Sequence, residues 1–225
     1  MLKIARDTKT LRELTLEKMR EAILSNYFRP GQRLVERTLC DELGVSRTIV
    51  REVLRHLETE GLVESVPQQG PVVATIDPRK AAEIYEIRGL LEGHAARACA
   101  EHCTAEVIAE LSLKVVEIEN AFNNQDFRMV LEKTTDFYKA MFIGGGKAMA
   151  WEIVQSLNAR INQLRSMTIG SAGRGAVAIA EMNAILDAIK RRDGEDAHQQ
   201  SLKHIQSVAR LAAAKLGEID EATGS

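Results

Sequence analysis

The stretch GVSRTIVREVL, residues 44–54, places a glycine and a serine directly before a helical pattern with regularly spaced arginines. Ser46 is a good helix N-cap, and Gly44 suits the end of a preceding helix because it adopts a left-handed backbone without strain. Since four residues make about one helical turn, the arginines share one face of the helix. They are Arg47, Arg51 and Arg55. The stretch predicts a tight turn between two helices, the second of which carries a ridge of guanidinium groups.

The sequence on either side completes a small domain. Helices are expected over residues 10–28, 36–43 and 47–60. Two short β-like runs, residues 62–66 and 72–75, flank a Pro- and Gly-containing turn and predict a hairpin. Three helices followed by a hairpin form a winged helix-turn-helix, whose second motif helix can lie in the DNA major groove.

Beyond a linker at residues 76–79 the pattern is helical throughout, with no strand pattern and no repeat. Helices are expected over residues 78–102, 104–123, 126–142, 147–168, 175–192 and 195–216. The Gly144–Gly146 run predicts an interhelical turn, because it lacks the spacing of a phosphate-binding loop. The sequence therefore predicts a mainly α protein with a winged helix-turn-helix over residues 1–76 and an all-helical bundle of six or seven helices over residues 77–225.

Composition narrows the class of protein. The chain has 225 residues, of which 45% are hydrophobic and 28% charged, and this mixture is typical of a globular, helix-rich protein. The formal net charge is −2, so a nucleic-acid partner requires positive charge gathered on one surface. No apolar run reaches 18 residues, and three cysteines are an odd number. We expect a cytoplasmic protein that does not associate with a membrane.

The guanidinium ridge fits base recognition in DNA. An arginine fork matches the O6 and N7 acceptors of guanine. Ser46 and Thr48, with the backbone N–H groups at the start of their helix, are suited to a phosphate, and the Gln69 region at the hairpin tip is suited to the DNA backbone or minor groove. The alternative is an ordinary solvated charged face, since Glu52 and Glu58 lie on the same helix.

Residues 30–63, PGQRLVERTLCDELGVSRTIVREVLRHLETEGLV, resemble the DNA-binding domain of the GntR family of bacterial repressors. The resemblance is dense, and one local departure is Ile49, where the family often has Pro or Thr. It implies double-stranded DNA as a partner. The residues implicated by the resemblance or by the predicted hairpin tip are Arg37, Ser46, Arg47, Thr48, Arg51, Gln69 and Gly70.

The helical remainder resembles the FadR-type branch of that family, whose effector domain is called FCD. The similarity is carried by Arg88 with Leu91 and Glu92, the Phe137 region, Glu181 to Ile189, and residues 202–205. It implies a homodimer and a small-molecule pocket inside the bundle.

Many FCD domains hold a divalent metal with one Asp and three His. The resemblance puts Thr134, Tyr138 and Asn183 at or next to three of those ligand positions and leaves only His204 matching. A single imidazole cannot hold Zn or Ni, which need about three or four protein donors. We therefore expect no metal and no other cofactor.

In place of a metal site, Thr134, Tyr138, Asn183 and His204 are expected to form a neutral hydrogen-bonding cluster. Three arginines are candidates for adding positive charge to this interior: Arg88, Arg160 and Arg165. A buried guanidinium requires an anion, so a carboxylate or phosphate metabolite is the expected ligand. Alternatively, the polar groups satisfy one another or water, and Arg160 and Arg165 lie on a dimer surface.

These observations favour a ligand-responsive transcriptional repressor that binds a palindromic operator as a homodimer. A small anionic metabolite in the helical domain would alter its affinity for DNA. No nucleophile–base arrangement is evident, so no catalytic residues are expected. Two alternatives stay open, an architectural DNA-binding protein with no effector and a helical enzyme domain with a vestigial DNA-binding head.

Overall fold

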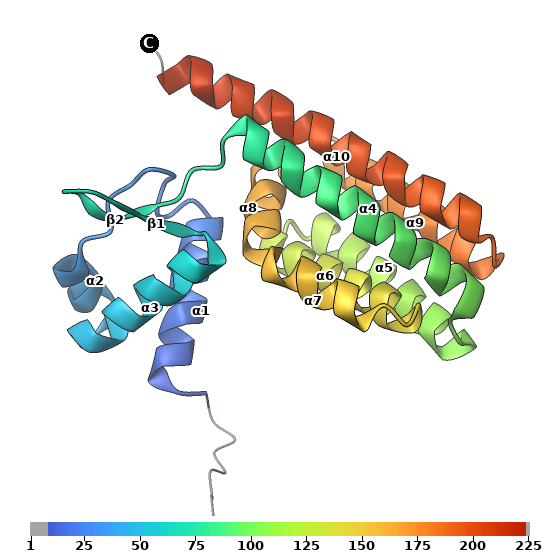
Figure 1. Cartoon of the computed structure of the whole chain (residues 1–225), viewed down its shortest axis with the longest axis horizontal. Coiled ribbons are helices and arrows are strands. Elements are labelled where there is room, and N and C mark those ends of the chain that lie inside the picture. The colour runs from blue at the N-terminus through green and yellow to red at the C-terminus, as the bar shows by residue number, and fades with distance from the viewer. Residues whose placement is uncertain (1–8, 224–225) are drawn as a thin grey trace, which may run out of the picture. The chain divides into compact units, whose positions relative to one another are not determined.

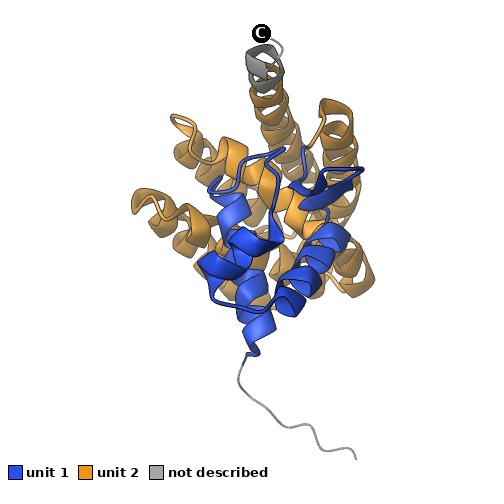
Figure 2. Cartoon of the chain, turned by 90° about the vertical axis from the view of Figure 1, so that its left-hand side faces the viewer, with its two compact units in different colours: residues 1–75 blue, residues 76–225 orange. Residues whose placement is uncertain are grey.

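The computed structural model describes residues 9–223 of the chain. The chain divides into two compact units, residues 1–75 and residues 76–225 (Figure 2). The sequence placed this boundary between residues 76 and 77. Each unit is described by itself.

The first unit contains three helices followed by a two-stranded antiparallel hairpin, which is the predicted winged helix-turn-helix (Figure 1). Val63 pairs with Val73 at the open end of the hairpin, and Val66 pairs with Gly70 at the turn. The elements are α1 (Leu11–Leu24), α2 (Glu36–Leu43), α3 (Arg47–Glu60), β1 (Val63–Val66) and β2 (Gly70–Val73).

Local capping sets the ends of these helices. Thr10 and Glu13 form a capping box at the start of α1, in which each side chain accepts a bond from the other residue's backbone N–H. The turn before α3 needs Gly44 because its φ is +66°, and Ser46 caps α3 by accepting from the N–H of Ile49 at 3.4 Å. The short turn predicted from the sequence is therefore confirmed.

Apolar side chains on the inner faces of α1, α2 and α3 form the core of the first unit. Its members include Leu16, Met19, Ile23, Leu39, Val50, Val53, Leu54, Leu57, Leu62 and Val73, all buried. Two ion pairs tie α1 to α3 at the edge of this core: Arg12 lies 3.3 Å from Glu52, and Arg20 lies 2.5 Å from Glu60.

The second unit is a bundle built only of helices in the residues that the structure describes. Its helices are α4 (Pro78–His102), α5 (Ala105–Asn123), α6 (Phe127–Gly144), α7 (Ala148–Ser156), α8 (Asn158–Thr168), α9 (Arg174–Lys190) and α10 (Gly194–Thr223). Within residues 9–223, no helix combines the length and the apolar character needed to cross a membrane.

The prediction of one helix over residues 147–168 was wrong. The helix is interrupted at Leu157, whose backbone N–H bonds to the carbonyl of Val154 instead of continuing the α-helical pattern. No Gly or Pro marks the position. Trp151 and Val154 of α7 and Ile161 and Leu164 of α8 are all buried, so packing on the bundle favours the change of direction.

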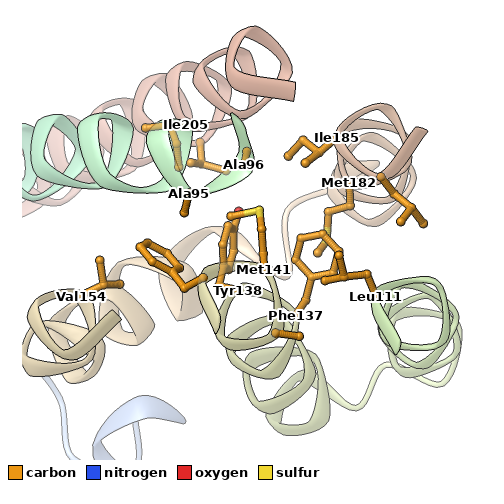
Figure 3. Close-up of a cluster of buried hydrophobic side chains, with 14 of the residues drawn as sticks. Ala95, Ala96, Leu111, Phe137, Tyr138, Met141, Val154, Met182, Ile185 and Ile205 are labelled. Atoms are coloured by element: carbon orange, nitrogen blue, oxygen red, sulfur yellow. The ribbon is translucent and has the colours of Figure 1, made fainter. Parts of the chain in front are cut away.

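Helices α4 and α10 lie side by side along their length (Figure 1). Glycines on α4 make this close approach possible, because a Cβ at Gly93 would lie 2.9 Å from Nδ1 of His198. Beneath this pair, apolar side chains from α4, α5, α6, α7, α9 and α10 meet in one cluster (Figure 3). Phe137, Tyr138 and Met141 of α6 lie at its centre and are buried.

The glycine run at residues 144–146 ends α6 against the backbone of α4. A Cβ at Gly145 would lie 2.8 Å from the backbone nitrogen of Cys99 and 3.1 Å from the carbonyl oxygen of Ala95. Gly146 has φ of +68°, in the left-handed region that glycine tolerates. The run forms the predicted interhelical turn, and contact with α4 explains why side chains are missing there.

Candidate nucleic-acid interface and buried cavity

The ridge on α3 is open to solvent. Arg47, Arg51 and Arg55 are exposed, whereas the opposite face of the helix is buried in the core. The acidic residues Glu52 and Glu60 on the same helix are paired with α1, as described above. Arg47 and Arg55 have no ion-pair partner among the side chains that the structure describes. Two of the three acidic side chains of α3 are therefore engaged by α1, while Glu58 stays exposed.

Arg51 is positioned by the helix before it. Its Nε lies 2.9 Å from both carboxylate oxygens of Glu36, at the start of α2. The hydrogen bond and the charge of Glu36 together raise the pKa of Arg51. More than half of the Arg51 side chain stays exposed, at 59%. The guanidinium is thus held in place while part of it stays available to a ligand.

The remaining predicted DNA contacts surround this ridge. Arg37 on α2 and Thr48 in the first turn of α3 are exposed. Ser46 is also exposed, but its hydroxyl is engaged because it caps α3. A phosphate would therefore be bound by the backbone N–H groups of Ser46 and its neighbours.

The wing has a tight tip. Gln68 has φ of +66° and Gly70 has φ of +82°, so both occupy the left-handed region across the turn. Gln69 bonds back to the carbonyl of Val66 through its N–H at 3.1 Å, and its side chain is exposed. The turn therefore projects two glutamine side chains into solvent.

A cavity of about 50 Å³ lies between the helices of the second unit. Six helices and the segment after α8 contribute to its wall, and the wall is apolar except for a few charged and hydroxyl groups. It is lined by Tyr85, Arg88, Phe122, Val130, Leu131, Thr134, Arg165, Thr168, Ile169, Arg174, Ala178, Met182, His204 and Val208.

The structure brings together part of the predicted ligand cluster. Arg88, Thr134 and His204 line the cavity, and Arg165 does so as well. Tyr138 lies behind this wall, with its ring centroid 6.4 Å from that of His204.

Two predicted residues lie elsewhere and are corrected. Asn183 is exposed and lines a separate surface groove of about 800 Å³, while its neighbour Met182 faces the cavity. One residue rotates the side-chain direction by about 100° on a helix with 3.6 residues per turn, so a shift of one position exchanges the two sides. Arg160 is exposed, because it lies five positions before the inward-facing Arg165 on α8, which turns its side chain by about 140° around the helix axis.

Arg88 is paired within its own helix. Its Nε lies 2.7 Å from Oε1 of Glu92 and its Nη2 lies 3.3 Å from Oε2, and both side chains are 1% exposed. Burial disfavours the charged guanidinium, but the Glu92 carboxylate outweighs burial and raises the pKa of Arg88. Arg88 therefore carries a charge that the protein already neutralises.

A second pairing joins α9 and α10. Oε2 of Glu181 lies 3.0 Å from Nη1 of Arg174 and 2.8 Å from Nδ1 of His204. Burial works against ionised Glu181, but hydrogen bonds from His204 and Ser207 and the charge of Arg174 lower its pKa to about 2. Burial lowers the pKa of His204, more than the Glu181 carboxylate raises it. The sequence analysis did not single out Arg174 and named Glu181 only as part of the resemblance, although their spacing of seven residues would place them on one face of α9.

Arg165 has a different environment. Its Nη1 donates to the side-chain oxygens of Asn162 at 3.1 Å and of Thr135 at 3.4 Å, both neutral groups. Its Cζ also lies 5.3 Å from the ring centroid of Tyr138. Burial and the nearby charge of Arg88 lower the pKa of Arg165 to about 10, so it stays protonated at neutral pH.

The donor set around the cavity does not fit a divalent metal. Across residues 9–218, no group of three or more His, Cys, Asp and Glu side chains is arranged to hold an ion. Thr134 and Tyr138 present hydroxyls, Asn183 points elsewhere, and the carboxylate next to His204 is engaged by Arg174. The carboxylates of Glu92 and Glu181 are already paired with the cavity residues Arg88 and Arg174.

Comparison with known proteins assigns the chain to a family. Residues 11–73 match the model described as "Bacterial regulatory proteins, gntR family", and residues 83–207 match the FCD domain. Because the two matches cover most of the chain, it belongs to the GntR family of transcription regulators, in the branch with an FCD domain. It is a regulator and not an enzyme, which excludes one of the two alternatives from the sequence.

Related proteins of known name include repressors. The chain is 28% identical over 213 residues to the galactonate operon transcriptional repressor of Escherichia coli. The alignment covers 84% of this chain and 90% of that protein. It is 23% identical over 191 residues to the E. coli repressor RspR, covering 85% of this chain and 84% of that one.

Solved structures show the same fold. E. coli McbR/YncC superposes with a TM-score of 0.76 at 21% identity, over 92% of this chain and 99% of that one. The structure of a GntR regulator from Rhodococcus sp. RHA1 superposes with a TM-score of 0.76 at 20% identity. The superposition covers 90% of this chain and 97% of that one.

Proposed function

We propose that the protein is a ligand-responsive transcriptional repressor that acts in the cytoplasm and binds a palindromic operator as a homodimer. The single observation that supports the DNA-binding part best is the exposed row of arginines on α3. Glu52 and Glu60 of this helix pair with α1, and the arginines face solvent on a helix that begins directly after a Gly-Val-Ser turn. Arg47 and Arg51 would read base edges, and Arg37, Thr48 and the tip of the wing would position the unit on the phosphate backbone.

A homodimer is supported by the surface of the helical unit. Helix α4 exposes Leu90 at 67% and Ile87 at 38%, one turn apart on the side away from the cavity. Apolar side chains placed together on a helix surface favour association with another apolar surface. A symmetric pair of chains would present two copies of α3 to the two halves of a palindrome.

The cavity supports effector binding. It is lined by guanidinium groups and hydroxyls in an otherwise apolar wall, which suits a small anion. One relative is named as the repressor of a galactonate operon, and galactonate is a carboxylate. In our proposal the ligand changes the population of spacings between the two DNA-binding units, and only one spacing fits both half-sites.

The test is a substitution on the ridge. Arg47→Ala should weaken binding to the operator by roughly 1–3 kcal/mol while it changes binding to random DNA much less. The operator is obtained by capturing genomic fragments with the full-length protein, and affinities are measured by fluorescence anisotropy. Arg128→Ala is the matched control, because Arg128 is exposed on the second unit. Equal affinity of Arg47→Ala and wild type for the operator would contradict the role given to Arg47.

A further inference from the structure

We propose that the cavity is selective for a ligand with one negative charge, a short monocarboxylate, and that Arg165 sets this selectivity. The inference deepens the proposed function, because it rests on the cavity being the effector site. It specifies the charge of the ligand and names Arg165 as the residue that binds the charged group.

The argument begins with the balance of charge around the cavity. Three guanidinium groups line it, from Arg88, Arg165 and Arg174. Two carboxylates lie within ion-pair distance of them, Glu92 on Arg88 and Glu181 on Arg174. One positive charge is left without a carboxylate among the side chains that the structure describes, and it belongs to Arg165.

His204 does not change this balance at neutral pH. It is buried, its pKa lies below its ordinary value, and its Nδ1 faces the Glu181 carboxylate. The neutral ring leaves its other nitrogen for a ligand or a neighbour. The net charge that the protein presents to the cavity is therefore close to one positive unit.

Arg165 also has the bonding capacity to take a ligand. A guanidinium has five N–H donors, and the bonds to Thr135 and Asn162 use only one of its nitrogens, Nη1. Nearby, the hydroxyl of Tyr138 is buried and has no hydrogen-bond partner within the described residues. A planar carboxylate matches the free edge of a guanidinium in a bidentate arrangement.

Other ligand classes fit less well. A second negative charge would have no free cation, and an unpaired buried charge costs several kcal/mol, so a dianion should bind on the order of 100-fold more weakly. A neutral analogue would leave Arg165 unpaired. The volume of about 50 Å³ exceeds the roughly 10–15 Å³ that one water needs, so a ligand of a few heavy atoms fits without rearrangement.

Three probes of nearly equal size separate these classes: propionate with one charge, propanamide with none, and malonate with two. Each is titrated into the full-length protein at constant ionic strength, with calorimetry and the melting temperature as readouts. We expect binding of propionate and much weaker binding of the other two. Malonate or propanamide binding as tightly as propionate would overturn the inference, and so would no binding of propionate.

Variants on α8 test whether Arg165 is the residue that binds propionate. Arg165→Met should abolish the response to propionate, and it should fold because it removes a partly buried charge that lacks a carboxylate. Arg160→Met is the matched control, since Arg160 is exposed and off the cavity, and should respond like wild type. Arg165→Lys keeps the charge but loses the fork, so it should retain weakened binding with the same preference for propionate.

Operator binding separates this inference from the proposed function. Operator binding is measured for the wild type in ligand-free buffer, so this measurement does not depend on the ligand preference of the cavity. If Arg165→Met still responds to propionate like wild type, the inference is overturned while the repressor stands. If wild type binds no operator, the proposed function fails whatever the titrations show.

Discussion

The buried Arg88–Glu92 pair offers a quantitative test of the second unit. Both side chains are 1% exposed, and the pair is bidentate within one helix turn. Glu92→Gln keeps the size of the side chain and removes its charge, which leaves the Arg88 guanidinium buried without a carboxylate. Breaking a buried pair in this way costs about 3–5 kcal/mol of folding free energy. Since a domain of this size loses roughly 2–4 °C per kcal/mol, the melting temperature should fall by about 6–20 °C.

The chain supplies a matched control. Arg128 and Glu132 have the same i, i+4 spacing on α6 but are exposed at 62% and 50%, with 3.7 Å between Nη1 and Oε2. Glu132→Gln should change stability by less than about 0.5 kcal/mol, because exposed pairs contribute little. Calorimetry on the full-length protein at neutral pH and fixed salt measures both variants.

A small effect of Glu92→Gln, equal to that of Glu132→Gln, would refute the reasoning. It would show that Arg88 is hydrated or finds another anion. A third variant gives an independent check, because replacing both partners with apolar residues, Arg88→Met with Glu92→Leu, should recover most of the lost stability. The cavity would also gain a positive charge in Glu92→Gln, so this variant should bind malonate better relative to propionate than wild type does.

Three further predictions follow from particular contacts. Gly145→Ala should destabilise the protein by about 1–3 kcal/mol, because its Cβ would press on the backbone of α4. Gly217→Ala in α10 should stabilise it by about 0.5–1 kcal/mol, because a Cβ there would contact no other atom. Calorimetry compares the two variants, and equal effects would contradict the packing of α6 on α4. The pKa of Glu181, lowered to about 2, means that its pairing stabilises the fold above pH 4.5 and that this stability, up to about 3 kcal/mol, is lost as the pH falls toward 2. Denaturant unfolding should therefore separate wild type from Glu181→Gln at pH 6 and bring them together near pH 2, and a constant gap would count against the pairing. Thr10→Ala should cost about 1 kcal/mol through loss of the capping box of α1, and a loss below about 0.3 kcal/mol would show that the cap is dispensable.

The sequence was sufficient for the DNA-binding unit because local signals agree there. Gly44 and Ser46 fix the turn by backbone conformation and capping, and the apolar spacing on α3 selects the buried face. Because that face is buried, the arginines on the opposite face of α3 point toward solvent. Each step depends on neighbours in the chain, so no tertiary information was needed.

The helical unit was predicted less completely, because its details depend on packing between distant segments. No Gly or Pro in the sequence marks the break at Leu157. It follows from the packing of the buried side chains of α7 and α8 against the rest of the bundle. The cavity wall on α9 runs through Arg174, Ala178 and Met182, and a resemblance aligned one residue away pointed to the exposed Asn183.

Charge pairing was the part hardest to foresee. Sequence alone suggested Arg88, Arg160 and Arg165 as candidate sources of positive charge, with Arg88 favoured. The structure shows Arg88 neutralised by Glu92, Arg160 in solvent, and Arg165 facing the cavity beside neutral partners. Which guanidinium is available to a ligand follows from three-dimensional neighbours that no spacing rule specifies.

The most direct test of the account is capture of genomic DNA by the purified full-length protein, followed by sequencing of the retained fragments, with the double variant Arg47→Ala and Arg51→Ala run in parallel. The account predicts that wild type enriches a short palindrome and that the double variant loses this enrichment. Fragments without a shared palindrome, or the same palindrome enriched equally by the double variant, would contradict the assignment of α3 as the helix that reads DNA.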